Sequence, residues 1–146
     1  MNILVLNRSD WLDERNVRLV DRRADHIRSV LRAAVGDSLR VGELNGDLGQ
    51  GCIRALDAEA VVLEVDLKQP PPPRHRFDIV LALPRPKVLR RLFRTVAEYG
   101  VANLHLINCA RVEKSYWQSP LLAPEKVNDA LLAGLERASD TVAPRV

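Results

Sequence analysis

The sequence has little of what redox, metal-binding and membrane proteins need. Of its 146 residues only two are cysteines and 4% are aromatic, and no apolar stretch approaches the roughly 18 residues that cross a bilayer. Cys52 and Cys109 each lie in an apolar run, with no Cys-x-x-Cys pair, which favours buried free thiols over a disulfide or zinc site. The apolar N-terminus lacks the basic leader of a signal peptide, so we expect a cytoplasmic chain without a membrane span.

The motifs of several enzyme classes are also missing. The sequence contains neither Gly-x-Gly-x-x-Gly nor Gly-x-x-x-x-Gly-Lys-Ser/Thr, so it has no dinucleotide fingerprint and no P-loop. Its three histidines, His26, His75 and His105, do not form a hydrolase constellation with Asp and Ser, and they lack the spacing of metal ligands. The sequence therefore identifies no metal site and no catalytic residue.

The sequence does have 47% apolar and 28% charged residues, enough for one ordinary domain or two small ones with a real core. Its net charge of +3 is unevenly distributed. Residues 1–73 carry 10 basic and 12 acidic side chains, whereas residues 74–146 carry 12 and 7. The excess of basic residues in the second part is expected of a surface that meets phosphates or an acidic partner.

Four consecutive prolines at residues 70–73 divide the chain. Proline donates no backbone hydrogen bond and favours an extended conformation, so residues 71–76 predict a stiff linker between units of residues 1–70 and 77–146. Short β-branched or alternating runs separated by turn sequences predict a small antiparallel β-barrel before the linker. The runs are residues 3–6, 17–19, 39–41, 51–55 and 61–65. A helix at residues 24–34 interrupts them, with Ile27, Val30 and Leu31 on its apolar face.

After the linker, the pattern alternates between strands and helices. Strands are expected at residues 77–83 and 103–108, helices at 88–99 and 124–137, and a loop at 109–122. This βαβα order indicates a parallel sheet, and the apolar runs 79–83 and 104–107 are typical of strands covered on both faces. Gly100 stands where a glycine commonly ends a helix.

The helix at residues 88–99 has one apolar and one basic face, at about 100° per residue. The apolar stripe consists of Val88, Leu89, Leu92, Phe93, Val96 and Tyr99. The basic cluster consists of Lys87, Arg90, Arg91 and Arg94, and Arg85 extends it. Among nearby acids only Glu98 can pair, with Arg94, so the cations repel one another unless a polyanion relieves the repulsion. A merely solvated face is the alternative.

The loop at residues 109–122 combines basic and aromatic side chains. It follows a strand of the predicted parallel sheet, at the edge where ligands normally bind. Arg, Lys, Tyr and Trp together offer phosphate contacts and a stacking platform for an unpaired base, although Tyr116 and Trp117 can equally anchor the loop. The candidate RNA-binding residues are therefore Arg28, Arg32, Arg85, Lys87, Arg90, Arg91, Arg94, Arg111, Lys114 and Trp117.

Six segments spread over nearly the whole chain form a characteristic series. They are residues 26–32, 36–37 and 45–49 in the first part, and residues 81–87, 95–101 and 112–120 in the second. In this order they resemble the RsmE-type 16S rRNA uracil-N3 methyltransferases. The resemblance implies a PUA-like RNA-binding barrel followed by a SPOUT-type α/β domain. It also implies transfer of a methyl group from S-adenosylmethionine to N3 of one uridine in 16S rRNA.

The resemblance also sets expectations for what this chain holds. The glycine-rich S-adenosylmethionine loops and the trefoil knot of the family come after the position of Val146, so we expect a truncated SPOUT domain whose cofactor site lies beyond this chain. The implied partners are 16S rRNA or the small ribosomal subunit, and a second copy in a homodimer. The alternatives are a non-catalytic RNA-binding module and a protein-interaction domain whose basic helix meets an acidic partner.

Overall fold

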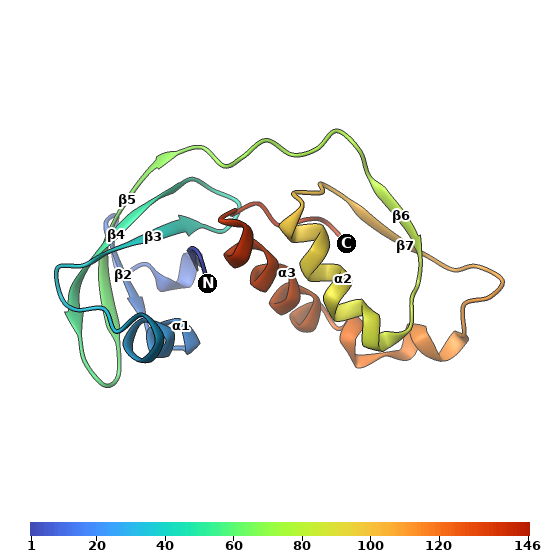
Figure 1. Ribbon diagram of the computed structural model, residues 1–146, viewed down its shortest axis with the longest axis horizontal. Helices are drawn as coiled ribbons and strands as arrows, with labels where there is room; N and C mark the ends of the chain where they lie inside the picture. Colours follow the sequence, from blue (N-terminus) through green and yellow to red (C-terminus); the bar gives the residue numbers. More distant parts are fainter.

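The computed structural model describes all residues, 1–146, and contains two separate sheets (Figure 1). The first part forms a curled five-stranded sheet in the order β1-β3-β4-β5-β2. Its strands are β1 (Leu4–Leu6), β2 (Asn16–Leu19), β3 (Ser38–Glu43), β4 (Leu48–Leu56) and β5 (Val61–Gln69). A 3₁₀ turn, η1 (Arg8–Asp10), separates β1 from β2. Each predicted strand of this part overlaps an observed one.

The sheet is an open half-barrel, so the prediction of an antiparallel barrel is only partly right. β1 and β2 lie at opposite edges, and β1 pairs in parallel with β3, with Leu4 opposite Val41. The other neighbours are antiparallel, and register shifts in the β4–β5 ladder are the kind of irregularity that bends a sheet. The apolar face of the sheet packs against Ala24 and Ile27, which closes this core.

The helix predicted for residues 24–34 is shorter than expected and changes its winding. α1 (Arg22–His26) passes into a π-helical turn, η2 (Ile27–Leu31), which ends at Arg32 in a left-handed conformation with φ 51°. A π turn accommodates one extra residue, so the following side chains rotate away from the predicted face. Ile27 is fully buried, but Val30 and Leu31 are 64% and 44% exposed. The predicted apolar face is therefore wrong beyond Ile27.

The second part contains two parallel strands and two helices. β6 (Ile79–Ala82) pairs with β7 (Leu104–Ile107), and Arg145 forms a parallel bridge to Asn103 beside β7. α2 (Pro86–Glu98) follows β6, and α3 (Pro124–Ala138) follows two short turns, η3 (Lys114–Gln118) and η4 (Pro120–Leu122), within the predicted loop. The predicted βαβα order, the parallel pairing and the end of α2 at Gly100, with φ 64°, are confirmed.

Only one face of the β6–β7 sheet is covered. Leu81 and Leu104 belong to the core formed with the helices, whereas Val80 and Ile107 on the opposite face are 62% and 39% exposed. The prediction that both faces are covered is wrong for this chain, because both helices pack on the same side.

The buried stripe of α2 is also narrower than predicted. Leu89, Phe93 and Val96 are buried, whereas Val88 and Tyr99 at the margins of the stripe are 38% and 67% exposed. α2 packs mainly against α3 and also touches η4, and the margin of the stripe at Val88 and Tyr99 faces solvent.

Both cysteines are free, but their predicted burial is wrong. Cys52 is partly buried and Cys109 is exposed, because β7 ends at Ile107 and leaves Cys109 in the loop that follows. None of the helices is both long enough and apolar enough to cross a membrane.

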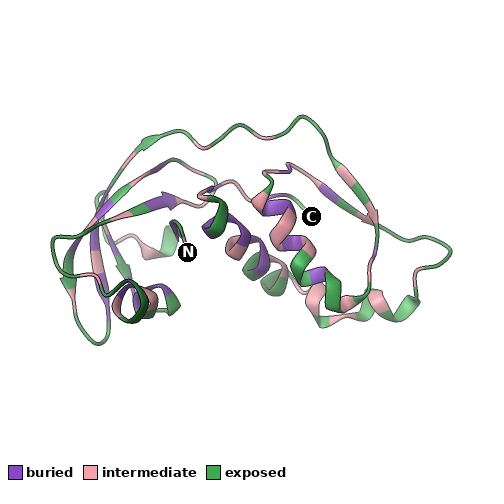
Figure 2. Ribbon diagram, in the orientation of Figure 1, coloured by how far each residue is buried: buried purple, intermediate pink, exposed green.

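The two parts share a core. α3 lies between the five-stranded sheet and α2 (Figure 1), and one cluster of 13 buried apolar residues joins Ile3, Val5 and Leu48 to α2 and α3. Figure 2 shows buried residues where these elements face one another. By contrast, residues 70–76 run along the outside of the molecule and are mostly exposed.

Candidate nucleic-acid interface

The two parallel strands end beside each other, and the segments that follow carry four of the predicted basic residues. The backbone N–H of Leu83 donates to the carbonyl oxygen of Ile107 at 3.0 Å, which holds the two exits together. Parallel sheets bind ligands at this carboxyl edge. The basic residues of these two exit segments are Arg85, Lys87, Arg111 and Lys114.

The start of α2 lacks the acidic residues that usually stabilise a helix N-terminus. Pro86 lies in its first turn, which contains no acidic residue, and no side chain caps it. Arg85, Lys87 and Arg90 are exposed near this end, which carries the positive charge of the helix dipole. Cations are unfavourable there, and the same end attracts anions. The local sequence therefore places exposed cations at the positive end of a helix dipole.

None of the predicted basic residues on α2 or at the carboxyl edge has a carboxylate partner. The nine ion pairs of the structure include none of Arg85, Lys87, Arg90, Arg91, Arg94, Arg111 and Lys114. The predicted pairing of Glu98 with Arg94 is wrong, because α3 brings Arg137 Nε within 3.4 Å of Glu98 Oε1. Arg94 is partly buried, and its Nε has no hydrogen-bond partner.

The two aromatic residues of the loop have different surroundings. Tyr116 is partly buried against the core of the helices, and its hydroxyl donates to Glu113 Oε1 at 3.2 Å. Trp117 is 40% exposed, and its Nε1 donates to Asn108 Oδ1 at 3.3 Å, which ties η3 to the end of β7. Tyr116 thus anchors the loop, while the ring of Trp117 stays accessible at the carboxyl edge.

Arg28 and Arg32 lie on the other part of the molecule, on the segment that contains α1 and η2, and Figure 1 shows α1 well apart from α2. Arg28 donates to Asp25 Oδ1 at 2.7 Å and to the carbonyl oxygen of Asp57 at 2.9 Å, so its guanidinium already joins α1 to the β4–β5 turn. Arg32 is exposed and forms no ion pair. The structure therefore gathers the residues of α2 and the loop but does not bring these two arginines to them.

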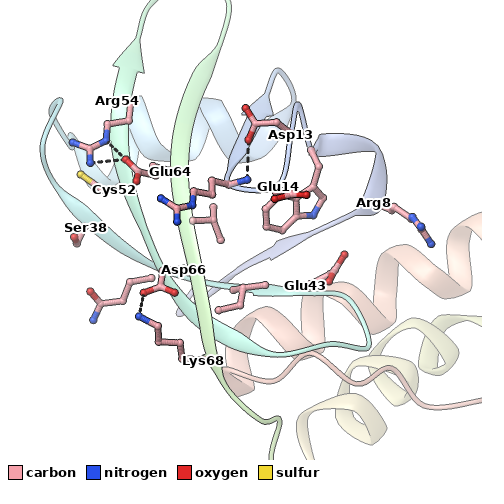
Figure 3. Close-up of a pocket in the computed structure, with 15 residues that line it drawn as sticks. Arg8, Asp13, Glu14, Ser38, Glu43, Cys52, Arg54, Glu64, Asp66 and Lys68 are labelled. Carbon is pink, nitrogen blue, oxygen red and sulfur yellow. Dashed lines mark hydrogen bonds and ion pairs between the residues drawn. The ribbon is translucent and has the colours of Figure 1, made fainter.

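The main hollow of the structure lies elsewhere, on the polar side of the five-stranded sheet (Figure 3). It has a volume of about 1300 Å³, and five acidic and four basic residues line it. Arg54 pairs with Glu64, and Lys68 pairs with Asp66, as Figure 3 shows. Because its charges are balanced, this groove has no excess of positive charge with which to attract phosphates.

A buried ion network also compensates charge in the first part, around a residue that sequence reasoning missed. Arg23 is 5% exposed and donates to Asp10 at 2.6 and 2.8 Å, to Asp21 at 2.7 Å and to the carbonyl oxygen of Val5 at 2.8 Å. Burial alone would lower the pKa of Arg23, but the hydrogen bonds to Asp10 and Asp21 raise it above its ordinary value. The sequence hints at the role of Arg23 only through Asp21, an N-cap residue two positions before it.

No group of three His, Cys, Asp or Glu side chains is placed to hold a metal ion. The candidate functional residues are those predicted from the sequence, the basic side chains and Trp117.

The chain is similar to two curated methyltransferases. "Ribosomal RNA small subunit methyltransferase E" of Treponema pallidum is 32% identical over 127 residues, which cover 86% of this chain and 48% of that protein. "Ribosomal RNA small subunit methyltransferase E 1" of Borreliella burgdorferi is 21% identical over 146 residues, which cover 100% of this chain and 60% of that protein. The chain thus spans between 48% and 60% of the length of these relatives. No protein-family model matches it.

Solved structures share its fold. A probable rRNA-methyltransferase from Porphyromonas gingivalis has a TM-score of 0.75 and 21% identity, covering 99% of this chain and 58% of that one. Ribosomal RNA small subunit methyltransferase E from Neisseria gonorrhoeae, bound to S-adenosyl methionine, has a TM-score of 0.73 and 14% identity. The match covers 100% of this chain and 60% of that one. The resemblance predicted from the sequence is therefore confirmed by the curated relatives, and the overall fold by the solved structures.

Proposed function

We propose that this chain, which is related over most of its length to the ribosomal RNA small subunit methyltransferase E proteins, is the rRNA-binding part of a methyltransferase. The observation that carries the proposal is the group of basic side chains without carboxylate partners on α2 and at the carboxyl edge of the β6–β7 sheet. Phosphates that bind such residues relieve the repulsion between them and release condensed counterions. The names of the relatives indicate which RNA supplies these phosphates.

The same relatives indicate the class of reaction, which is methyl transfer with S-adenosylmethionine as donor. We propose N3 of a uridine in 16S rRNA as the acceptor, as the sequence resemblance implies. N3 of uracil takes part in base pairing, so the base must leave its pair before this atom can react. In this chain Trp117 stacks on the unpaired base, while Arg111 and Lys114 hold neighbouring phosphates.

The residues of this chain do not fit S-adenosylmethionine. A nucleoside donor needs a concave pocket that backbone groups can approach closely, which glycine-rich loops commonly provide. The exit segments at residues 83–87 and 108–114 contain no glycine. The two hollows described lie on the five-stranded sheet and between α1 and α3. Calorimetry on the isolated chain should detect no binding of S-adenosylmethionine, and a 1:1 micromolar heat signal would contradict this assignment.

The proposal extends to the organisation of the chain. Residues 1–70 are the PUA-like unit, residues 71–76 the linker, and residues 77–146 the N-terminal half of a SPOUT domain that acts as a homodimer in the cytoplasm. The uncovered face of the β6–β7 sheet, with Val80 and Ile107, supports association, because exposed apolar faces favour it. A non-catalytic RNA-binding module would use the same contacts, but the names of the relatives do not favour it.

The two tryptophans offer a direct test of where RNA binds. Trp117 lies at the carboxyl edge, and Trp11 lines the groove of the five-stranded sheet. In a Trp11→Phe variant, titration with a single-stranded 16S rRNA fragment that contains uridine should quench the fluorescence of Trp117, because stacked bases quench indole. The matched Trp117→Phe variant, which keeps Trp11, should show little change. Quenching of Trp11 alone, or no RNA binding by either variant, would contradict the proposal.

A further inference from the structure

The loop after β7 is closed by its own side chains. Trp117 Nε1 donates to Asn108 Oδ1 at 3.3 Å, which joins η3 to the first residue after β7. Between them, the backbone N–H of Val112 donates to the carbonyl oxygen of Cys109 at 2.9 Å and closes a turn. Tyr116 packs against the core of the helices. Asn108 and Trp117 therefore have fixed neighbours, although both are exposed.

The bond from Trp117 determines how the Asn108 amide is oriented. An indole N–H is a donor only, so it must face the amide oxygen and not the amide nitrogen. The bond that Oδ1 accepts is the one hydrogen bond of this side chain, which leaves Asn108 Nδ2 free. An amide without such a tether can turn over and offer either its oxygen or its nitrogen. Asn108 therefore presents only donors to a ligand.

The other polar side chains of the loop offer no second oriented amide. Its one acid, Glu113, accepts the hydroxyl of Tyr116 at 3.2 Å, and Ser119 Oγ accepts the backbone N–H of Leu121 at 3.3 Å. Gln118 is exposed and its amide forms no hydrogen bond, so it is free to turn over. Of the two amide side chains in the loop, only that of Asn108 is held in one orientation.

Asn108 also lies beside the surface on which a base can stack. It directly follows β7 at the carboxyl edge, where Leu83 N donates to the carbonyl oxygen of Ile107 at 3.0 Å and joins the two strand exits. Its Nδ2 is bonded to the same carbon as Oδ1, so Nδ2 lies next to the edge of the Trp117 indole. The loop thus combines an exposed stacking ring with a donor of fixed orientation at its edge.

We propose that Asn108 is a specificity-determining residue, whose amide N–H₂ group donates to O4 of a uracil stacked on Trp117. Stacking alone tolerates any base, because every base has a π-face. Uracil carries an acceptor oxygen at this position, whereas cytosine carries an amino group, which donates. An oriented donor therefore distinguishes the two pyrimidines, since cytosine would place two donors against each other. This inference rests on the proposed function and adds how its base is selected.

The test compares two single-stranded RNAs that carry either uridine or cytidine at one central position, between abasic positions. Their affinities for the full chain are measured by fluorescence anisotropy of a dye on the RNA. The wild-type chain should bind the uridine RNA about tenfold more tightly. Asn108→Asp keeps an oxygen for the indole N–H but replaces the donor with an acceptor, so it should reverse the preference. Gln118→Glu adds the same charge to the same loop without a tethered amide, and it should keep the preference for uridine.

A further variant tests the tether itself. Trp117→Phe keeps an aromatic ring for stacking but has no N–H, so the Asn108 amide becomes free to turn over. The ratio of the two affinities should therefore fall towards one. A weaker stacking ring alone would lower both affinities by the same factor and leave their ratio unchanged.

The ratio of the two affinities decides the inference, because damage to the fold weakens the binding of both RNAs alike. Equal affinities in the wild-type chain, an unchanged ratio in Asn108→Asp or Trp117→Phe, or a reversal in Gln118→Glu would overturn it. If both RNAs quench the fluorescence of Trp117 but bind equally well, the inference fails and the proposed function stands. If neither RNA binds the wild-type chain, the proposed function fails and the inference fails with it.

Discussion

The two parts of this molecule use their basic residues differently. Five of the nine ion pairs lie within the five-stranded part, where they involve Arg23, Arg28, Arg54 and Lys68. The α/β part has two internal pairs, one to His105 and one to Arg137, and neither involves its exposed basic face. The two parts have similar numbers of basic residues, 10 and 12, but 12 and 7 acidic ones. What differs is how many cations remain free to bind an external anion.

The difference has a local origin. In the five-stranded part, the acids lie on neighbouring strands or one helical turn away: Arg54 on β4 pairs with Glu64 on β5, and Arg28 follows Asp25 by three residues. In α2 no acid occurs before Glu98. The chain therefore neutralises one set of arginines as it folds and leaves the other set unpaired.

The largest expected effect comes from breaking the buried network. Arg23→Met leaves Asp10 buried without its main partner and should lower the free energy of unfolding by about 3–5 kcal/mol, measured by urea denaturation at pH 7. Arg54→Met removes an exposed pair and should cost at most about 1 kcal/mol. Arg91→Met removes an unpaired cation and should stay within about 0.5 kcal/mol of the wild-type chain. Similar losses of unfolding free energy in all three variants would contradict the distinction between paired and unpaired arginines.

A second change tests whether packing, rather than ion pairs, holds α2 in place. A Cβ atom at Gly134 would overlap the carbonyl oxygen of Arg94 and approach the Ala97 Cβ to 2.8 Å. Gly134→Ala should therefore lower the free energy of unfolding by about 1–3 kcal/mol, even though alanine favours helices by about 1 kcal/mol. Thermal and urea unfolding show whether the variant is less or more stable than the wild-type chain. A more stable variant would show that α2 and α3 can separate at little cost.

The third prediction concerns acid, and its effect is smaller. The hydrogen bond from Arg23 lowers the pKa of Asp21 below its ordinary value. A carboxylate with a depressed pKa in the folded state contributes stability above its unfolded pKa and loses it as the pH falls through the folded value. The melting temperature of the wild-type chain should therefore fall more steeply below about pH 4 than that of Asp21→Asn, which keeps an N-cap residue. Parallel profiles between about pH 2 and 6 would contradict this role of Asp21.

Much of this contrast could be predicted from the sequence, because strand runs, helix order and the basic face of α2 depend on local periodicity. The ion pairs could not be predicted where their partners are distant in sequence. Local spacing favours Arg94 as the partner of Glu98, one turn away, but the observed partner, Arg137, comes from another helix. Arg74 and Asp140 are 66 residues apart, and nothing local links them.

Backbone irregularity and missing neighbours explain the other differences. Val30 and Leu31 fit the apolar face of a regular α-helix, and only the π turn at η2 moves them into solvent. Likewise, the apolar composition of β6 and β7 resembles that of strands covered on both faces, but the face with Val80 and Ile107 has no neighbour in this chain. Periodicity shows which residues prefer burial, and it does not show what is present to cover them.

The salt dependence of RNA binding tests the central claim most directly, namely that the unpaired cations of α2 contact phosphates. Affinity for a 16S rRNA hairpin is measured at several salt concentrations for the wild-type chain and two triple variants. The first changes Arg90, Arg91 and Arg94 to alanine, and the second changes Arg8, Arg15 and Arg54 in the groove. The first should make the slope of log K against log salt less negative, by roughly one unit for each phosphate that is no longer bound. The second should leave the slope unchanged. An unchanged slope for the α2 variant, or an equal decrease for the groove variant, would contradict the claim.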